Sequence, residues 1–136
     1  MSLFVDTSTW SLALRRDARV VAPEVRALVR AIELGEAIFT TGLVLQELLQ
    51  GFSGPKARSQ ILDRFSALPL IVPDRDDHVE AAELRNRCRR AGMQIGTIDA
   101  LLAQLCVRHE LTMLSTDQDF KRIAGRSTMK LWSEPA

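Results

Sequence analysis

The stretch Leu3-Phe4-Val5-Asp6-Thr7-Ser8-Thr9 is the part of the sequence that decides the fold. Three apolar residues are followed at once by a carboxylate and three hydroxyl residues, the types that cap the N-terminus of a helix. This order predicts a short buried strand that leads directly into a helix, as in parallel α/β proteins. Because Asp6 interrupts the only apolar start, we expect no signal peptide and a cytoplasmic protein.

The rest of the chain alternates short apolar runs with amphipathic segments. Residues 23–34 begin with proline and repeat apolar side chains at helical spacing, which predicts a helix. We expect further helices at residues 42–51, 54–67, 76–91 and 97–109, and further strands at residues 37–39, 70–72, 111–114 and 129–132. The alternation predicts an α/β fold of three α/β/α layers around a short, mainly parallel sheet of four to five strands. Since no repeat or composition break divides the chain, we expect residues 1–136 to form a single domain.

The composition is that of an ordinary soluble protein, with 46% hydrophobic and 26% charged residues. No apolar run approaches the ~20 residues that a membrane span requires, so we expect no membrane association. The net charge is +1, and 15 of the 18 basic residues are arginine. If a metal neutralised four of the 17 acids, 13 acidic residues would face 18 basic ones. An arginine-rich surface of this kind suits a phosphate-backbone substrate.

Four acidic residues are placed to meet at the carboxyl edge of the predicted sheet, where functional groups of parallel sheets collect. Asp6 and Asp117 each follow a strand. Glu47 lies inside a helix on the side expected to face the core, and Asp99 lies in the first turn of another helix. Carboxylates held this close raise one another's pKa unless a cation neutralises them. All-oxygen ligands select hard ions such as Mg²⁺ or Mn²⁺, and magnesium held by carboxylates is the usual apparatus for phosphodiester hydrolysis.

Each acid also has a purely structural interpretation. Asp99, Asp117 and Asp119 could be first-turn acids stabilised by helix dipoles, and the other two could be a turn residue and a solvated helix residue. Other α/β folds with acidic clusters fit less well. A phospho-acceptor receiver domain needs paired acids after its first strand and a lysine after its last. A haloacid-dehalogenase-like phosphatase needs Asp-x-Asp, but Ser8 occupies the second acidic position here.

Four blocks of the sequence resemble the motifs of the PIN-domain family, in order and at the expected spacing. They are Phe4-Val5-Asp6-Thr7-Ser8, Gln46-Glu47-Leu48, Thr97-Ile98-Asp99-Ala100-Leu101-Leu102-Ala103, and Leu114-Ser115-Thr116-Asp117-Gln118-Asp119-Phe120. Within this family the chain resembles the VapC-type toxins of toxin–antitoxin pairs. The resemblance implies a PIN-like fold and a Mg²⁺-dependent (or Mn²⁺-dependent) endoribonuclease, the toxin component of a type II, VapBC-like system. The alternative is a non-catalytic PIN module that serves as an RNA- or protein-binding scaffold.

The resemblance also implies roles for particular residues. Asp6, Glu47, Asp99 and Asp117 would be the catalytic, metal-binding acids, and Asp119 would be a supporting acid or the alternative fourth ligand. The hydroxyl residues that flank such a site would be Thr7 and Thr116.

The same resemblance implies three partners. RNA, with tRNA as one candidate, would be cleaved to leave a 5′-phosphate and a 3′-hydroxyl. A second copy of the chain would form a homodimer through the apolar face of the early helices. A cognate VapB-like antitoxin would cover the active site, and the candidate residues for its groove are Trp10, Leu12, Leu14 and Phe52.

The run Arg85-Asn86-Arg87-Cys88-Arg89-Arg90 has two interpretations. It can be the solvated face of a helix, or a surface that contacts phosphates beside the acidic centre. Neither His78 nor His109 stands in a catalytic context. The two cysteines have no metal-binding spacing, so we expect reduced, buried thiols.

Overall fold

The computed structural model describes residues 1–15 and 21–136. Its elements, in chain order, are β1 (Leu3–Val5), α1 (Thr7–Leu14), α2 (Pro23–Glu33), β2 (Ile38–Phe39), α3 (Gly42–Gly51), α4 (Pro55–Ser66), α5 (Arg75–Arg90), α6 (Thr97–Arg108), β3 (Thr112–Leu114), α7 (Gln118–Ala124) and β4 (Lys130–Leu131). The predicted α/β class is confirmed.

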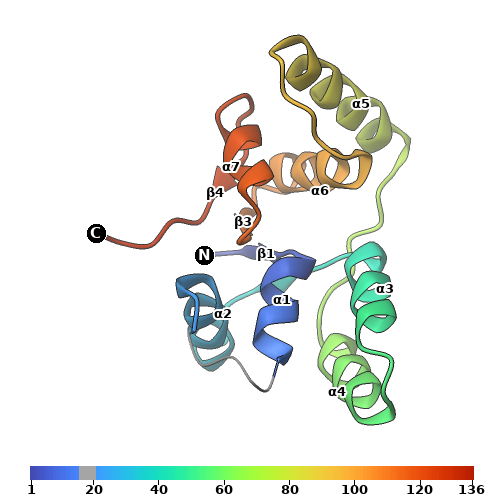
Figure 1. Cartoon of the computed structure of the whole chain (residues 1–136), viewed down its shortest axis with the longest axis vertical. Helices are drawn as coiled ribbons and strands as arrows, with labels where there is room; N and C mark the ends of the chain where they lie inside the picture. The colour runs from blue at the N-terminus through green and yellow to red at the C-terminus, as the bar shows by residue number, and fades with distance from the viewer. Residues whose placement is uncertain (16–20) are drawn as a thin grey trace.

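The four strands form one sheet in the order β2-β1-β3-β4, and every neighbouring pair is parallel. Phe4 of β1 is paired with Phe39 on one side and with Met113 on the other. Figure 1 shows α1 and α2 on one side of the sheet and α6 and α7 on the other, with α5 stacked outside α6. The three-layer arrangement follows from this, and it places the carboxyl ends of β1 and β3 next to each other.

The sheet has four strands, within the predicted four to five, but the strand expected at residues 70–72 is wrong. Only a single parallel bridge, between Thr40 and Leu70, forms there. Leu70 is 47% exposed and Val72 is 81% exposed, so Ile71 is the one residue of the segment that packs against the core. A proline on either side of the segment also removes backbone donors that a longer ladder would need.

The sequence pattern predicts Thr97 and Thr116 as the N-caps of the last two helices, but each cap lies one residue away, which affects the acids. The cap of α7 is Asp117 rather than Thr116, and its side chain accepts a hydrogen bond from the Asp119 backbone N–H at 2.9 Å. Thr97 is already the first residue of α6, so the N-cap is Gly96, which has no side chain to cap with. The N-terminus of α6 is therefore left without a side-chain acceptor, which favours negative charge nearby.

Buried side chains hold the two helices that carry the acids, α6 and α7, against the core. Phe120 and Ile123 of α7 are buried, as are Leu102 and Leu105 of α6.

Both cysteines are buried free thiols, as predicted. Within residues 1–15 and 21–136, no helix combines the length and the apolar composition needed to cross a bilayer.

Candidate metal centre

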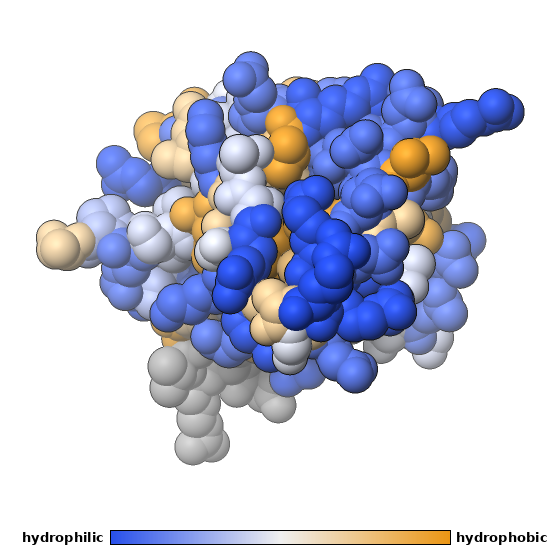
Figure 2. Space-filling view, turned by 90° about the horizontal axis from the view of Figure 1, so that it is seen from above, coloured by the Kyte–Doolittle hydropathy of each residue, from blue (hydrophilic) through white to orange (hydrophobic). Residues whose placement is uncertain are grey.

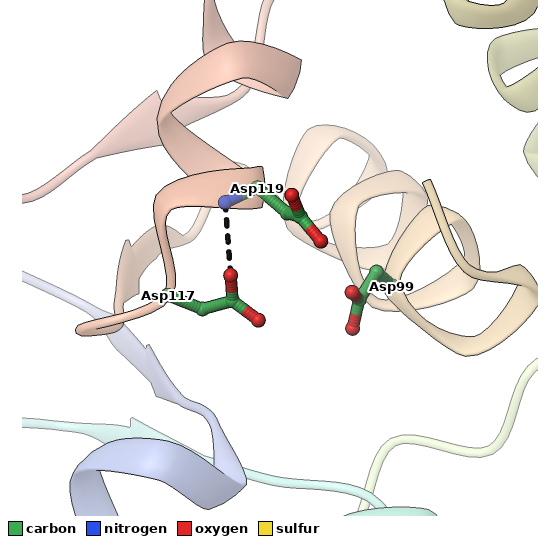
Figure 3. A group of neighbouring side chains, drawn as sticks. All are labelled: Asp99, Asp117 and Asp119. Atoms are coloured by element: carbon green, nitrogen blue, oxygen red, sulfur yellow. Dashed lines mark hydrogen bonds between the residues drawn. The ribbon is translucent and has the colours of Figure 1, made fainter. Parts of the chain in front are cut away.

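Three carboxylates meet above the carboxyl end of β3. Asp99 comes from the first turn of α6, Asp117 is the N-cap of α7, and Asp119 lies in the first turn of α7. Each contributes an oxygen atom, and these oxygens lie within 4.8 Å of one another. Figure 3 shows the Asp99 side chain projecting from α6 towards the two aspartates of α7. Of the sequence-predicted acids in the described residues, these three share the tightest space.

Asp6 lies beside this group and is engaged differently. It caps α1 through a hydrogen bond from the Thr9 backbone N–H, and only 5% of its surface is exposed. Ser115 Oγ donates to its Oδ2 at 2.7 Å, and Ser8 Oγ donates to its Oδ1 at 2.8 Å. The structure therefore holds Asp6 as a buried, hydrogen-bonded carboxylate whose charge still acts on Asp99 and Asp117.

Glu47 stands at the solvent side of the centre. The prediction that it faces the core is wrong, because Glu47 is exposed whereas Val44 and Leu48 on the same helix are buried. Adjacent residues of a helix point about 100° apart, so a buried Leu48 turns Glu47 away from the core. Its Oε1 accepts a hydrogen bond from Thr7 Oγ1 at 3.1 Å, and its charge raises the pKa of Asp99.

Hydroxyl groups connect the ends of β1 and β3. Ser115 Oγ donates to Asp6 and also accepts a hydrogen bond from the Asp117 backbone N–H at 2.9 Å. Thr116 donates to Ser8 Oγ through its backbone N–H at 3.2 Å and through its Oγ1 at 3.0 Å. The two strand ends are thus tied together through side chains rather than through the sheet alone.

The family resemblance predicts Thr7 and Thr116 as the hydroxyl residues that flank the site. It does not predict that Ser8 and Ser115 donate hydrogen bonds to Asp6. The detectable signal was the repetition of hydroxyl residues next to an acid at both strand ends, in Asp6-Thr7-Ser8-Thr9 and Ser115-Thr116-Asp117. Once parallel pairing places these two segments side by side, hydroxyls of one segment can reach the carboxylate of the other.

The electrostatics of the centre favour a cation. The pKa of Asp99 is raised to about 6, mainly by burial and then by the negative charges of Asp117, Asp119, Asp6 and Glu47, in that order of importance. Burial also raises the pKa of Asp6, although its hydrogen bonds from Ser115 and Ser8 oppose this effect. Among the salt bridges of the described residues, one involves this group, the ion pair of Arg122 with Asp119. A hard divalent ion fits this set of oxygen donors and would remove the repulsion.

Without a divalent cation, we expect the free energy of unfolding to decrease as the pH rises from about 4 to about 6. The folded-state pKa of Asp99 lies above its ordinary value of 3.8, so the folded chain retains a proton that the unfolded chain has lost over this range. Urea denaturation in EDTA at a series of pH values measures the decrease. Asp99→Asn should reduce it, whereas Asp76→Asn at an exposed position of α5 should not. An Asp99→Asn variant with the wild-type pH dependence would contradict the electrostatic account.

We expect Ser115→Ala to lower the free energy of unfolding by roughly 1–3 kcal/mol, because it leaves buried Asp6 without one of its donors. The melting-temperature increase caused by Mn²⁺ should also become smaller, since Asp6 and Asp117 lose their connection. Ser127→Ala is the matched control, because its hydroxyl bonds only backbone groups of residues 123 and 129. Equal Mn²⁺-induced shifts in the two variants would show that Ser115 does not position the acids.

Comparison with known proteins identifies the family of this chain. The sequence model of the PIN domain matches residues 3–126. The chain is 32% identical over 124 residues to Ribonuclease VapC11 of Mycobacterium tuberculosis and to the VapC ribonuclease Mb1587 of Mycobacterium bovis. In both cases the match covers 90% of this chain and 91% of the relative.

Solved structures show the same fold. The crystal structure of VapBC2 from Rickettsia felis, bound to a DNA fragment from its promoter, matches with a TM-score of 0.72 and 22% identity over 98% of this chain and 100% of that one. The crystal structure of Mycobacterium tuberculosis VapC20, described as a sarcin-ricin loop cleaving toxin, matches with a TM-score of 0.66 and 20% identity over 89% and 94%. The strand-end acids, the fold and these matches together establish that the chain belongs to the PIN-domain family and, within it, to the VapC ribonucleases.

Proposed function

We propose that this chain is a Mg²⁺-dependent endoribonuclease, able to use Mn²⁺, and the toxin of a type II toxin–antitoxin pair. The observation that carries the proposal is the convergence of Asp99, Asp117 and Asp119 beside buried Asp6 and exposed Glu47. The 32% identity to proteins named VapC ribonucleases supports RNA as the substrate. Hard-ion coordination by carboxylates supports magnesium over zinc.

The chain's own residues would divide the work as follows. Asp99, Asp117 and Asp119 would hold the cation, since their oxygens already share one space. Asp6 would complete the set from within, oriented by Ser115 and Ser8. All five acids predicted from the sequence thus keep a role in the site. Asp119 would be a direct ligand of the cation rather than a supporting acid.

A bound divalent cation supplies Lewis-acid chemistry, which lowers the pKa of water and neutralises charge on a phosphodiester. Glu47 and Asp117 are the exposed carboxylates of the set, and of these two only Glu47 lies outside the group of three. A hydrogen bond from Thr7 fixes the direction of Glu47, so it is the acid best placed to exchange a proton with solvent. The helix N-termini of α6 and α7 stabilise the negative charge gathered in front of them.

We expect Asp99→Asn and Asp117→Asn each to reduce the single-turnover rate of RNA cleavage by about 100-fold or more, because loss of supporting groups alone costs 10- to 100-fold at metal sites. The assay uses purified protein, total RNA and Mn²⁺, with EDTA as the blank. Asp76→Asn makes the same chemical change at an exposed position outside the centre and should cleave normally.

Sequencing of the cleaved ends should find 5′-phosphates. Wild-type protein that binds RNA but cleaves none of it with Mn²⁺ would favour the scaffold function instead.

The antitoxin is proposed to lie in an apolar groove between α1, α2 and α4. Trp10 and Leu14 line this groove as predicted, but Leu12 and Phe52 are not among its lining residues. The indole N–H of Trp10 is buried and finds no acceptor within the described residues, so it is available to a carbonyl of an inserted segment. The Rickettsia felis structure contains VapBC2, which supports an antitoxin partner for this chain.

We expect Val29→Asp to weaken antitoxin binding while leaving RNA cleavage intact, because Val29 lines the groove and is 46% exposed. The matched control is Val79→Asp, at a 52% exposed position of α5 outside the groove. Co-expression with the adjacent upstream reading frame should relieve growth arrest by the wild type and by the control, but not by Val29→Asp. Full relief of the Val29→Asp variant would place the antitoxin elsewhere.

We also propose a homodimer, which the family resemblance places on the apolar face of the early helices. Leu34, at the end of α2, is 61% exposed there and lies outside the groove, and the exposed Leu70 and Val72 offer further apolar surface.

A further inference from the structure

We propose that a second cavity, lined by Arg85 and Arg89 at the end of α5, binds a phosphate of the RNA strand whose cleavage is proposed above. The cavity has a volume of about 270 Å³, and Met93, Gln94 and Ile95 complete its lining. The inference rests on the proposed ribonuclease function and adds a binding subsite to it. Of the two interpretations of residues 85–90, a surface that contacts phosphates is therefore favoured over a solvated helix face.

Arg85 is held in place for binding. Its Nε donates a hydrogen bond to the backbone carbonyl of Ile95 at 2.9 Å, and the side chain is half-buried. Leu84 and Cys88 on the same helix are fully buried, which fixes the face that Arg85 borders. A guanidinium group has five N–H donors, so four remain on the Nη atoms after this bond. Their planar arrangement matches two oxygens of a phosphate.

Arg89 lies one helical turn after Arg85 and lines the same cavity. Its Nη2 donates to Asn86 Oδ1 at 3.2 Å, a neutral partner that leaves the positive charge uncompensated. Two like charges four residues apart on a helix repel each other. An anion between the two guanidinium groups would replace this repulsion with attraction.

No acidic residue lines the cavity, and its two arginines, like most of the other described arginines, form no salt bridge. Across residues 1–15 and 21–136, the salt bridges of arginine are those of Arg26, Arg108 and Arg122. Arg85 and Arg89 have none there, although they share a cavity. Figure 2, which views the molecule from the end where α5 lies in Figure 1, shows a face dominated by hydrophilic residues. Such a face suits a polar partner better than an apolar one.

The backbone connects this cavity to the metal centre. Ile95, whose carbonyl holds Arg85, directly precedes Gly96, the N-cap of α6. A Cβ placed on Gly96 would lie 3.9 Å from Asp99 Oδ2, so this part of the loop borders the acidic group. A strand with one phosphate at the metal centre would pass this loop and bring another of its phosphates to Arg85 and Arg89. The acids alone would repel the RNA backbone, and a cationic subsite beside them offsets this.

The test is RNA binding in EDTA, which prevents cleavage, with a fluorescein-labelled single-stranded RNA of mixed sequence at several salt concentrations. We expect Arg89→Gln to weaken binding and to reduce the slope of log K against log[salt] by about 0.7, the value for one lost phosphate contact on a single strand. Arg85→Lys keeps the charge but loses the planar donors, so it should weaken binding with a smaller change in slope.

Arg90→Gln is the matched control. It removes one exposed arginine from the same helical turn but does not line the cavity. Equal affinities and slopes for Arg89→Gln and Arg90→Gln would overturn the proposal, as would wild-type protein that does not bind the RNA. So would an Arg89→Gln variant that loses only antitoxin binding. Because binding is measured without a metal, failure of cleavage with Mn²⁺ would count against the ribonuclease function and not against this subsite.

Discussion

Asp99 shares its surroundings with four other carboxylates, and the rest of the centre is organised against their mutual repulsion. The pKa of Asp99 is raised to about 6 because burial and neighbouring negative charges both disfavour its ionised form. The fold compensates by local means. Asp6 and Asp117 cap α1 and α7, while Asp99 and Asp119 lie in the first turns of α6 and α7. Three helix N-termini thus face the acids, each stabilising negative charge by roughly 0.3–1 kcal/mol.

The parallel sheet is the means by which distant segments reach this arrangement. Pairing of β1 with β3 places the residues that follow each strand next to each other. Ser8 and Ser115 then bond across the gap, and Ser115 connects the Asp6 carboxylate to the backbone of Asp117. Three arginines have two different roles around this centre. Arg122 forms an ion pair with Asp119, whereas Arg85 and Arg89, which form no salt bridge within the described residues, are proposed to bind a phosphate.

Features set by local sequence could be predicted, and features set by packing could not. An apolar run followed by capping residues identified β1 and the position of Asp6, because both depend on a few adjacent side chains. The exposure of Glu47 was not predictable from its apolar neighbours, since one residue's difference in helical phase reverses its direction. The strand expected at 70–72 failed because two of its three side chains are exposed, which depends on the whole fold. The anchoring of Arg85 by Ile95 depends on a loop conformation that no local pattern encodes.

The central claim is that the carboxylates of Asp99, Asp117 and Asp119 form one site for a hard divalent cation. Anomalous diffraction from crystals grown with Mn²⁺ tests it most directly, because it locates the ion without reference to activity. The account predicts an Mn²⁺ peak in contact with oxygens of these three residues, and its loss in Asp99→Asn crystals. A fully ordered acidic centre with no peak, or a peak bound only elsewhere on the protein, would contradict it.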